Sequence, residues 1–313
     1  MTETMMREAA ISFPMFGDFS INPKAYFTIF GRDIYWYGVI LAAAFLIAMI
    51  YMARRAKTFG LTSDNVYDEV LWLIPFGLIG CRLYFVLFQW DYYSQHLSEI
   101  IRIWDGGIAI YGGIIAGVIV LVFWSRHKKI PFGAILDLDA LGLILAQAIG
   151  RWGNFMNREA FGGETDIFCR MGLTTPGGET FYVHPTFLYE SLWNFAGFLF
   201  LHFWSKKPGN RKYDGQLFLM YVAWYGLGRA WVEGLRTDSL WLIPGVIRVS
   251  QLVAIVSALA VIAVLIIKAR RPQPPEKMYV NRVTNSPAAE PNGDAAGENK
   301  SNNESADNPT RKE

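Results

Sequence analysis

Charged residues are scarce in this sequence. They make up 18% of its 313 residues, whereas a typical soluble domain contains about 25%. Hydrophobic residues make up 52%, so the balance predicts a membrane protein with several spanning segments. Cysteine is almost absent as well. Cys81 lies in an apolar segment and Cys169 in a polar loop, and we therefore expect neither a disulfide framework nor a cysteine-based metal site.

Several motifs of common enzyme and transporter classes are missing. The sequence has no P-loop and no Gly-x-Ser-x-Gly elbow, which argues against an ATP-driven pump and a serine hydrolase. It has no His-Glu-x-x-His pair either, and we expect no metal and no cofactor. A formal net charge of +2 gives no indication of a nucleic-acid partner. The first 20 residues lack a continuous apolar core, so we expect no cleaved signal peptide.

Seven apolar segments are long enough to cross a bilayer, which takes about 20 residues of helix. We therefore predict an all-α membrane protein with seven transmembrane helices. The segments cover approximately residues 34–53, 70–90, 106–124, 130–149, 186–204, 215–234 and 247–268. The first, third and last are clear, whereas the other four carry embedded charges.

Basic residues follow every second segment and so fall on one side of the membrane. They are Arg54, Arg55 and Lys57; Arg126, Lys128 and Lys129; Lys206, Lys207, Arg211 and Lys212; and Lys268, Arg270 and Arg271. Because basic residues concentrate in cytoplasmic loops, we predict an N-outside, C-inside topology. The expected parts are an outer-face N-terminal arm (1–33), a transmembrane catalytic domain (34–268) with an outer-face head insert at about 153–185, and a disordered cytoplasmic tail (269–313).

Polar side chains inside the segments gather at one depth. At a rise of about 1.5 Å per residue, Arg82 lies just past the middle of the second segment and Arg229 in the outer half of the sixth. Glu190 and Tyr111 lie still closer to the outer surface. The exceptions, in the inner half of the fourth segment, are Asp137 and Asp139. Charged groups are costly inside a bilayer, so we predict a shared polar cavity that opens towards the outer leaflet.

Arginines dominate this outer cluster. Arg229, Glu233 and Arg236 are spaced i, i+4, i+7, which places them on one helix face. An Arg–Glu pair that joins helices explains the first two equally well. Arg151 and Arg158 follow the fourth segment. With them, the outer cluster has several guanidiniums and few acidic side chains. Guanidiniums suit the geometry of phosphate, so the excess predicts a bound anion.

The polar run at residues 150–159 reads GRWGNFMNRE. It closely resembles the signature of the prolipoprotein diacylglyceryl transferase family, whose pattern is G-R-x-G-N-F-x-N-x-E. Further similarities occur in the family's order, and the resemblance covers residues 34–268. These further similarities are Trp36-Tyr37-Gly38, Gly80-Cys81-Arg82, Trp104-Asp105-Gly106-Gly107, His184-Pro185, Leu188-Tyr189-Glu190, Tyr225-Gly226 with Arg229, Glu233 and Arg236, and Gln251.

The resemblance implies a bacterial enzyme of the cytoplasmic (inner) membrane. Such an enzyme moves the diacylglyceryl group of phosphatidylglycerol onto the lipobox cysteine in the signal peptide of a prolipoprotein, leaving a thioether and releasing glycerol phosphate. The residues that match the family's functional positions are Arg151, Arg229, Asn154, Tyr37 and Glu159. With them we assign lipid binding to Asn157, Glu233 and Arg236.

One position departs from the family. Many members have a histidine before the paired glycines of the third segment, where this chain has Tyr111. We hypothesise that Arg151 holds the lipid phosphate, that Arg229 stabilises the departing phosphate and the thiolate, and that Tyr111, or else His184, relays the proton. A lone histidine is more often a hydrogen-bonding structural residue than a catalytic one.

Two other classes are also compatible with arginines in a membrane cavity. A lipid flippase or anion transporter requires polar positions through the inner half as well, where the sequence supplies only Asp137 and Asp139. A scaffold protein explains the glycines and ion pairs as helix packing. It leaves the convergence of charges in the outer half unexplained.

Overall fold

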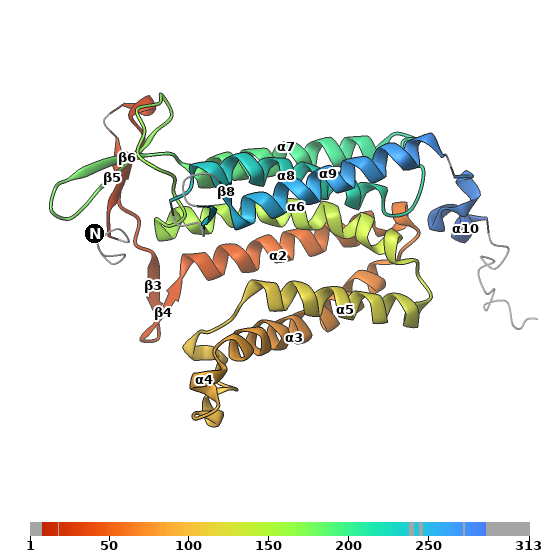
Figure 1. The fold of residues 1–313 in the computed structure, drawn as a ribbon, viewed down its shortest axis with the longest axis horizontal. Helices are drawn as coiled ribbons and strands as arrows, with labels where there is room; N and C mark the ends of the chain where they lie inside the picture. Colours follow the sequence, from red (N-terminus) through yellow and green to blue (C-terminus); the bar gives the residue numbers. More distant parts are fainter. Residues whose placement is uncertain (1–7, 18, 238–240, 244–246, 272, 286–313) are drawn as a thin grey trace, which may run out of the picture.

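The computed structural model describes residues 8–17, 19–237, 241–243, 247–271 and 273–285, and within them long helices form a bundle (Figure 1). These helices are α2 (Trp36–Arg55), α3 (Ser63–Phe88), α5 (Ile110–Lys128), α6 (Phe132–Asn157), α7 (Thr186–Lys206), α8 (Gln216–Leu235) and α9 (Val249–Arg270). The shorter helical pieces are α4 (Trp90–Tyr93), α10 (Tyr279–Thr284), and the 3-10 turns η1 (Pro14–Phe16), η2 (Ala56–Phe59), η3 (Leu97–Glu99), η4 (Ile103–Asp105) and η5 (Pro275–Lys277). The chain is thus mainly helical as predicted, but it also contains the strands described below, which the predicted all-α fold did not include.

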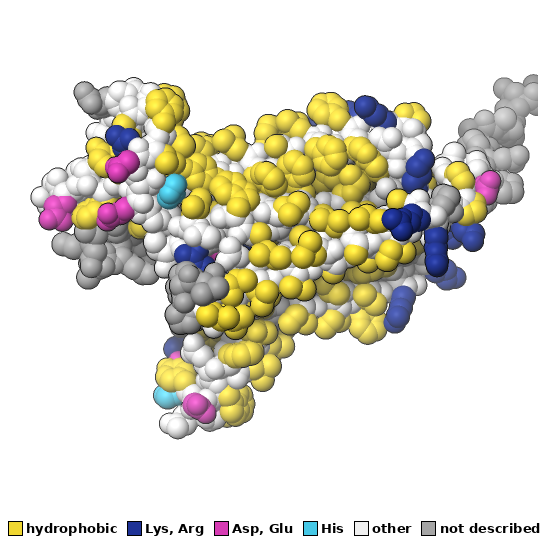
Figure 2. Space-filling view, turned by 45° about the horizontal axis from the view of Figure 1, so that its top comes forward, with side chains coloured by type: hydrophobic (Ala, Val, Ile, Leu, Met, Phe, Trp, Pro, Cys, Tyr) yellow, Lys and Arg dark blue, Asp and Glu magenta, His cyan; other side chains and the backbone are white. Residues whose placement is uncertain are grey.

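Five helices of the described chain are long and apolar enough to cross a membrane, namely α2 with η2, α3, α5, α6 and α9. Hydrophobic side chains cover the middle of the molecule in Figure 2, as they do where a protein surface faces lipid. The chain is thus a multi-pass membrane protein. Helices α7 and α8 have 21 and 20 residues but are not in this set, so the count of seven spans stays a prediction.

Helix α6 is the centre of the bundle. It packs against α2, α7 and α8, while α9 packs on α8 and α3 pairs with α5. Leu138, Leu141 and Ile144 of α6 are almost fully buried, because neighbours surround this helix on most sides. Close packing also explains the glycines of α3 and α5: a methyl group on Gly80 or Gly112 would collide with the facing helix.

Helices α3 and α6 extend furthest beyond their predicted segments. Helix α3 begins at Ser63, where Thr62 and Asn65 form a capping box, a turn geometry that satisfies the free backbone N–H groups of a helix start. Helix α6 continues to Asn157, so all but the last two residues of the signature run lie on its last turns and not in a loop after it. The polarity of these residues suggested a loop. Polar side chains can also occur at the end of a helix, because neighbouring elements there provide their hydrogen-bond partners.

Short strands at one end of the bundle were not predicted. A four-stranded sheet has the order β2-β1-β5-β6, and two hairpins pair β3 with β4 and β7 with β8. The strands are β1 (Ala10–Ser12), β2 (Ser20–Ile21), β3 (Tyr26–Ile29), β4 (Arg32–Tyr35), β5 (Met171–Thr174), β6 (Thr180–Val183), β7 (Trp241–Ile243) and β8 (Ile247–Arg248). Each strand has at most four residues, which is too short to show the alternation of apolar and polar residues that identifies a strand in a sequence. We call this end of the bundle the strand end.

The N-terminal arm and the head insert share that sheet. Strand β1 pairs antiparallel with β5, with Ile11 opposite Leu173, and both side chains are buried. Val183 and Phe187 complete the same small core. Residues far apart in sequence therefore form one unit at the strand end, where α6 ends and α7 begins.

The opposite end, which we call the basic end, carries the α7–α8 loop and the segment after α9 (Figure 1). Residues 273–285 were predicted to be disordered, but they contain η5 and α10. The backbone N–H of Tyr279 donates to Asp214 Oδ2 at 2.9 Å, which ties α10 to the bundle. Residues 286–313 of the predicted tail lie outside the described residues.

Candidate active site

A buried carboxylate lies at the strand end, where α6, α7 and α8 pack together. It belongs to Glu190 near the start of α7 and is 5% exposed. Arg151 of α6 places Nη2 2.6 Å from Glu190 Oε2, and Arg229 of α8 donates from Nη1 to Oε1 at 3.1 Å. Because a buried charge must be paired to be tolerated, this carboxylate fixes two guanidiniums from different helices at one point.

The rest of the cluster comes from α8 and the residue that follows it, and α9 adds a supporting hydrogen bond. Arg229 Nη2 forms an ion pair with Glu233 Oε2 one turn further along α8, as the i, i+4 spacing predicted. Arg236 Nη1 lies 3.9 Å from Glu190 Oε1, and Ser250 of α9 donates to Glu233 Oε1. We call the following five residues the arginine cluster: Arg151, Glu190, Arg229, Glu233 and Arg236.

A reciprocal pair of tryptophans aligns α7 with α8. The Nε1 of Trp193 donates to the carbonyl of Trp224, and the Nε1 of Trp224 donates to the carbonyl of Trp193, both at 3.0 Å. The rings fit beside Gly197 and Gly228, where any side chain would collide with them. This pairing sets the register of the two helices, and with it the position of Glu190 relative to Arg229.

The signature run continues the network along α6. Arg151 Nη1 donates to Asn154 Oδ1 at 3.3 Å, and Asn154 Nδ2 donates to Glu159 Oε1 at 2.8 Å. The chain reverses at Arg158, which has a left-handed φ of 50°, so Glu159 returns towards the helix. Asn157 is the last residue of α6 and is partly buried.

Tyr37 lies against the same run. It is the second residue of α2, and its ring packs on Gly153 so closely that an added Cβ there would lie 2.8 Å from Tyr37 Cδ2. Glu159 and Arg151 are its electrostatic neighbours. Glycine at position 153 therefore lets a hydroxyl from the first long helix approach the signature residues.

Arg158 does not belong to this cluster, although the sequence grouped it with the anion-binding arginines. It is buried, and its guanidinium donates to the carbonyls of Ala9, Met156 and Pro23 and to the side chain of Asn22. Burial lowers the pKa of Arg158. Its donors are used to fasten the N-terminal arm to the end of α6, which leaves it a structural role.

Arg82 is also engaged elsewhere. Its guanidinium donates to the carbonyls of Glu99, Ile100, Gly106 and Gly107 at 2.6 to 2.8 Å. It thereby holds the connection between α3 and α5 in place. The prediction that it shares one cavity with Arg229 came from depth alone, and depth does not specify which side of a helix a residue occupies.

The two proposed proton carriers have different surroundings. Tyr111 is 61% exposed at the start of α5, and its ring packs beside that of Tyr84, with centroids 6.4 Å apart. His184 follows β6, with Nδ1 3.4 Å from the hydroxyl of Tyr189. Burial lowers the pKa of His184, so its imidazole is neutral at pH 7. Its backbone also pairs with Gly163, which fits the structural role more common for a lone histidine.

The cluster is closer to charge balance than the sequence suggested. Three arginines meet two glutamates within it, and Glu159 adds a third carboxylate through Asn154. The expectation of few acids was wrong because Glu190 was not counted as their partner. The side chains of Arg151, Arg229 and Arg236 remain 20%, 19% and 14% exposed. An entering anion would therefore reach them and compete with the carboxylates.

Glu190 is the main site residue that our sequence assignment left out. It was visible as a charge near the outer end of the fifth segment and within the family-like Leu188-Tyr189-Glu190. The pairing of three arginines to it depends on α6, α7 and α8 with its C-terminal end meeting at one point. No local pattern along α7 contains that information.

Comparisons with known proteins all match one family. The family model described as prolipoprotein diacylglyceryl transferase matches residues 24–267. A phosphatidylglycerol–prolipoprotein diacylglyceryl transferase of Pediococcus pentosaceus is 42% identical over 274 residues, covering 85% of this chain and 97% of the relative. Proteins of the same name from Lactiplantibacillus plantarum and Limosilactobacillus reuteri are 45% and 46% identical, covering 79% and 80% of this chain and 89% and 92% of those relatives.

Proposed function

This chain belongs to the prolipoprotein diacylglyceryl transferase family, and from that membership we propose the reaction it catalyses. It transfers the diacylglyceryl group of phosphatidylglycerol to the lipobox cysteine in the signal peptide of a prolipoprotein, the first step of lipoprotein maturation. The cysteine sulfur bonds to the glyceryl carbon, the bond from that carbon to the phosphate oxygen breaks, and glycerol phosphate leaves with the electron pair.

The observation that carries this proposal is the convergence of Arg151 and Arg229 on Glu190. The phosphodiester of the lipid has one negative charge, and the leaving phosphate monoester has nearly two. Guanidiniums already positioned by a buried carboxylate stabilise the charge that develops as the bond breaks. They also favour the thiolate of the attacking cysteine, since neighbouring cations lower a thiol pKa.

We also propose roles for the individual residues. Arg151 binds the phosphate of the lipid substrate, and Arg229 stabilises the departing phosphate. Asn154, between Arg151 and Glu159, hydrogen-bonds the headgroup. Tyr37 is proposed to be a catalytic residue, and the remaining residues proposed to contact the lipid or its headgroup are Asn157, Glu159, Glu233 and Arg236.

We also propose the arrangement in the membrane. All seven long helices cross the bilayer of the bacterial cytoplasmic membrane, with the strand end outside and the C-terminus inside. Helices α7 and α8 support this because both pack against α6 within the bundle. Lysine and arginine side chains gather at the basic end (Figure 2), which favours that end as the cytoplasmic one.

The reaction is tested with the purified full-length protein in vesicles that contain phosphatidylglycerol. A synthetic peptide with a lipobox cysteine is added, and mass spectrometry follows the peptide while glycerol phosphate is quantified. We expect thioether-linked diacylglyceryl peptide and glycerol phosphate in equal amounts. Movement of lipid between leaflets without a thioether product would replace this proposal with a transporter.

Tyr111→Phe is expected to lower the rate of thioether formation about tenfold. The substitution removes the hydroxyl proposed to relay the proton, and acid–base groups contribute about 100-fold or more, of which water is expected to restore part. Tyr84→Phe is the matched control, because it removes the neighbouring hydroxyl across the α3–α5 contact. Equal rates for both variants would remove Tyr111 from the proton pathway.

A further inference from the structure

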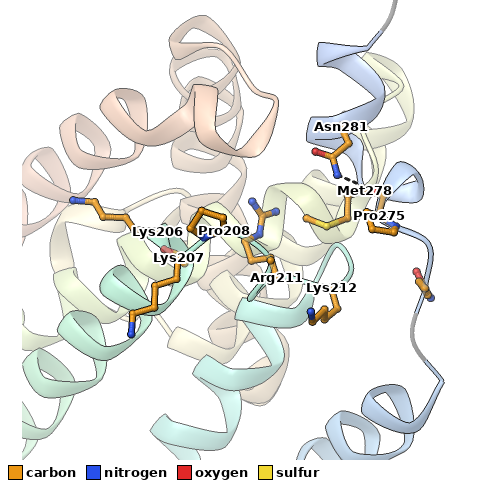
Figure 3. A pocket seen from close by; sticks show the side chains of 11 residues that line it. Lys206, Lys207, Pro208, Arg211, Lys212, Pro275, Met278 and Asn281 are labelled. Carbon is orange, nitrogen blue, oxygen red and sulfur yellow. Dashed lines mark hydrogen bonds between the residues drawn. The ribbon is translucent and has the colours of Figure 1, made fainter.

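A pocket at the basic end has no part in the proposed reaction. It has a volume of about 290 Å³ and lies where the end of α7 and the α7–α8 loop meet the segment after α9 (Figure 3). Glu190 lies about 15 residues before Ser205 of the pocket along α7, which corresponds to roughly 22 Å of helix. In the proposed topology, the pocket and the arginine cluster therefore lie towards opposite membrane surfaces.

The lining of this pocket is strongly cationic. Lys206, Lys207, Arg211 and Lys212 contribute to it, and no carboxylate occurs among its described lining residues. Within the described part of the chain, no ion pair joins any of the three lysines to an acid. Such a concentration of positive charge attracts an anion, because unpaired like charges repel one another in the absence of one.

Arg211 differs from the lysines. Its guanidinium lies 3.5 Å from Asp137 and 3.9 Å from Asp214, and it stacks over the ring of Phe59 at 4.2 Å. Its Nε is buried and has no hydrogen-bond partner among the described residues. These contacts thus hold Arg211 in place at the edge of the bundle. The lysines are exposed, and their positive charges are available to a ligand.

The opposite wall is folded and not a loose tail. Pro275, Met278 and Asn281 line it. Asn281 Nδ2 donates to the carbonyl of Pro275 at 2.7 Å, and Met278 is buried. The bond from Tyr279 N–H to Asp214 holds this wall against the α7–α8 loop. A concave site with two anchored sides binds small ligands better than lysines on an open surface.

We propose that this pocket binds a phosphate group. The source is either the headgroup of an anionic phospholipid in the adjoining leaflet or free phosphate, since both offer oxygens that accept hydrogen bonds from ammonium groups. The volume suits a headgroup and not a whole lipid. Basic pockets between helix ends at a membrane surface are a known way to bind anionic headgroups, and nothing in the proposed transfer reaction requires this one.

The test uses the purified full-length protein in a non-ionic detergent, with thermal unfolding as the readout. One titration adds phosphatidic acid in micelles and the other adds inorganic phosphate, because a ligand that binds the folded state raises its melting temperature. For Lys207→Gln/Lys212→Gln we expect the apparent Kd to rise about tenfold. Dependence on these lysines with phosphatidic acid alone identifies a lipid headgroup, and the same dependence with inorganic phosphate identifies the free anion.

Arg54→Gln/Arg126→Gln is the matched control. It removes the same charge from exposed residues at the basic end that do not line the pocket, and we expect its Kd to stay within about twofold of the original. Lys207→Arg/Lys212→Arg keeps the charge and is expected to retain binding, which excludes misfolding as the cause. An equal loss in the control, or unchanged binding in Lys207→Gln/Lys212→Gln, overturns the proposal. The arginine cluster is intact in every variant.

Discussion

Arg229→Ala is expected to lower the rate of thioether formation about 1,000-fold. Removing one preorganised donor from a site of developing negative charge costs about 100- to 1,000-fold in other enzymes. Arg229 is at the upper end of this range because its two terminal nitrogens are directed to two carboxylates, Glu190 and Glu233. It thus occupies the centre of the cluster, where the departing phosphate is proposed to lie.

The measurement is a single-turnover rate at saturating phosphatidylglycerol, which separates chemistry from lipid binding. Arg229→Lys keeps the positive charge but loses the planar fork, so we expect it to recover only a minor part of the rate. Arg126→Ala, at the exposed end of α5, is the matched control and should react normally. A near-normal rate for Arg229→Ala would exclude this residue from catalysis.

Glu190→Ala is expected to destabilise the folded protein by about 3–5 kcal/mol, the usual cost of removing one partner from a buried ion pair. Glu190 is the shared partner of Arg151, Arg229 and Arg236. Without it, three guanidiniums from two helices face one another with Glu233 as the remaining acid of the cluster. Denaturant titration in mixed micelles measures the free energy of unfolding.

The same variant also reports on the proposed ligand. If phosphate occupies the arginine cluster, it replaces the missing carboxylate, and phosphatidylglycerol should raise the melting temperature of Glu190→Ala more than that of the original protein. Glu164→Ala is the control, since Glu164 is exposed and its loss should change stability by less than about 0.5 kcal/mol. Equal stabilities of the two variants would show that Glu190 does not organise the cluster.

Much of the site was predictable where the chemistry is local. The face formed by Arg229 and Glu233 follows from helical spacing, and their ion pair is present. The signature residues Arg151, Asn154 and Glu159 are also neighbours in space, because α6 and its left-handed end bring them together. Short-range geometry is shared by all helices, so spacing alone suffices for these contacts.

Other predictions failed where two distant segments had to meet. Arg158 and Arg82 were grouped with the cluster by charge and depth, yet they bind backbone carbonyls of the N-terminal arm and of the α3–α5 connection. An arginine has several N–H donors, and the sequence around it does not indicate whether they bind phosphate or a backbone carbonyl oxygen. Which oxygens it meets depends on the path of the chain.

By itself the sequence determined the class of protein, the positions of the long helices and the family, because apolar length and a spaced signature are properties of contiguous residues. Only the tertiary structure decided which acid serves the arginines, that the N-terminal arm and head insert share one sheet, and that the residues after α9 wall a basic pocket. Each depends on side chains from separate helices or strands. The energy of such contacts comes from burial and pairing between segments, and neither is encoded in any single stretch of the chain.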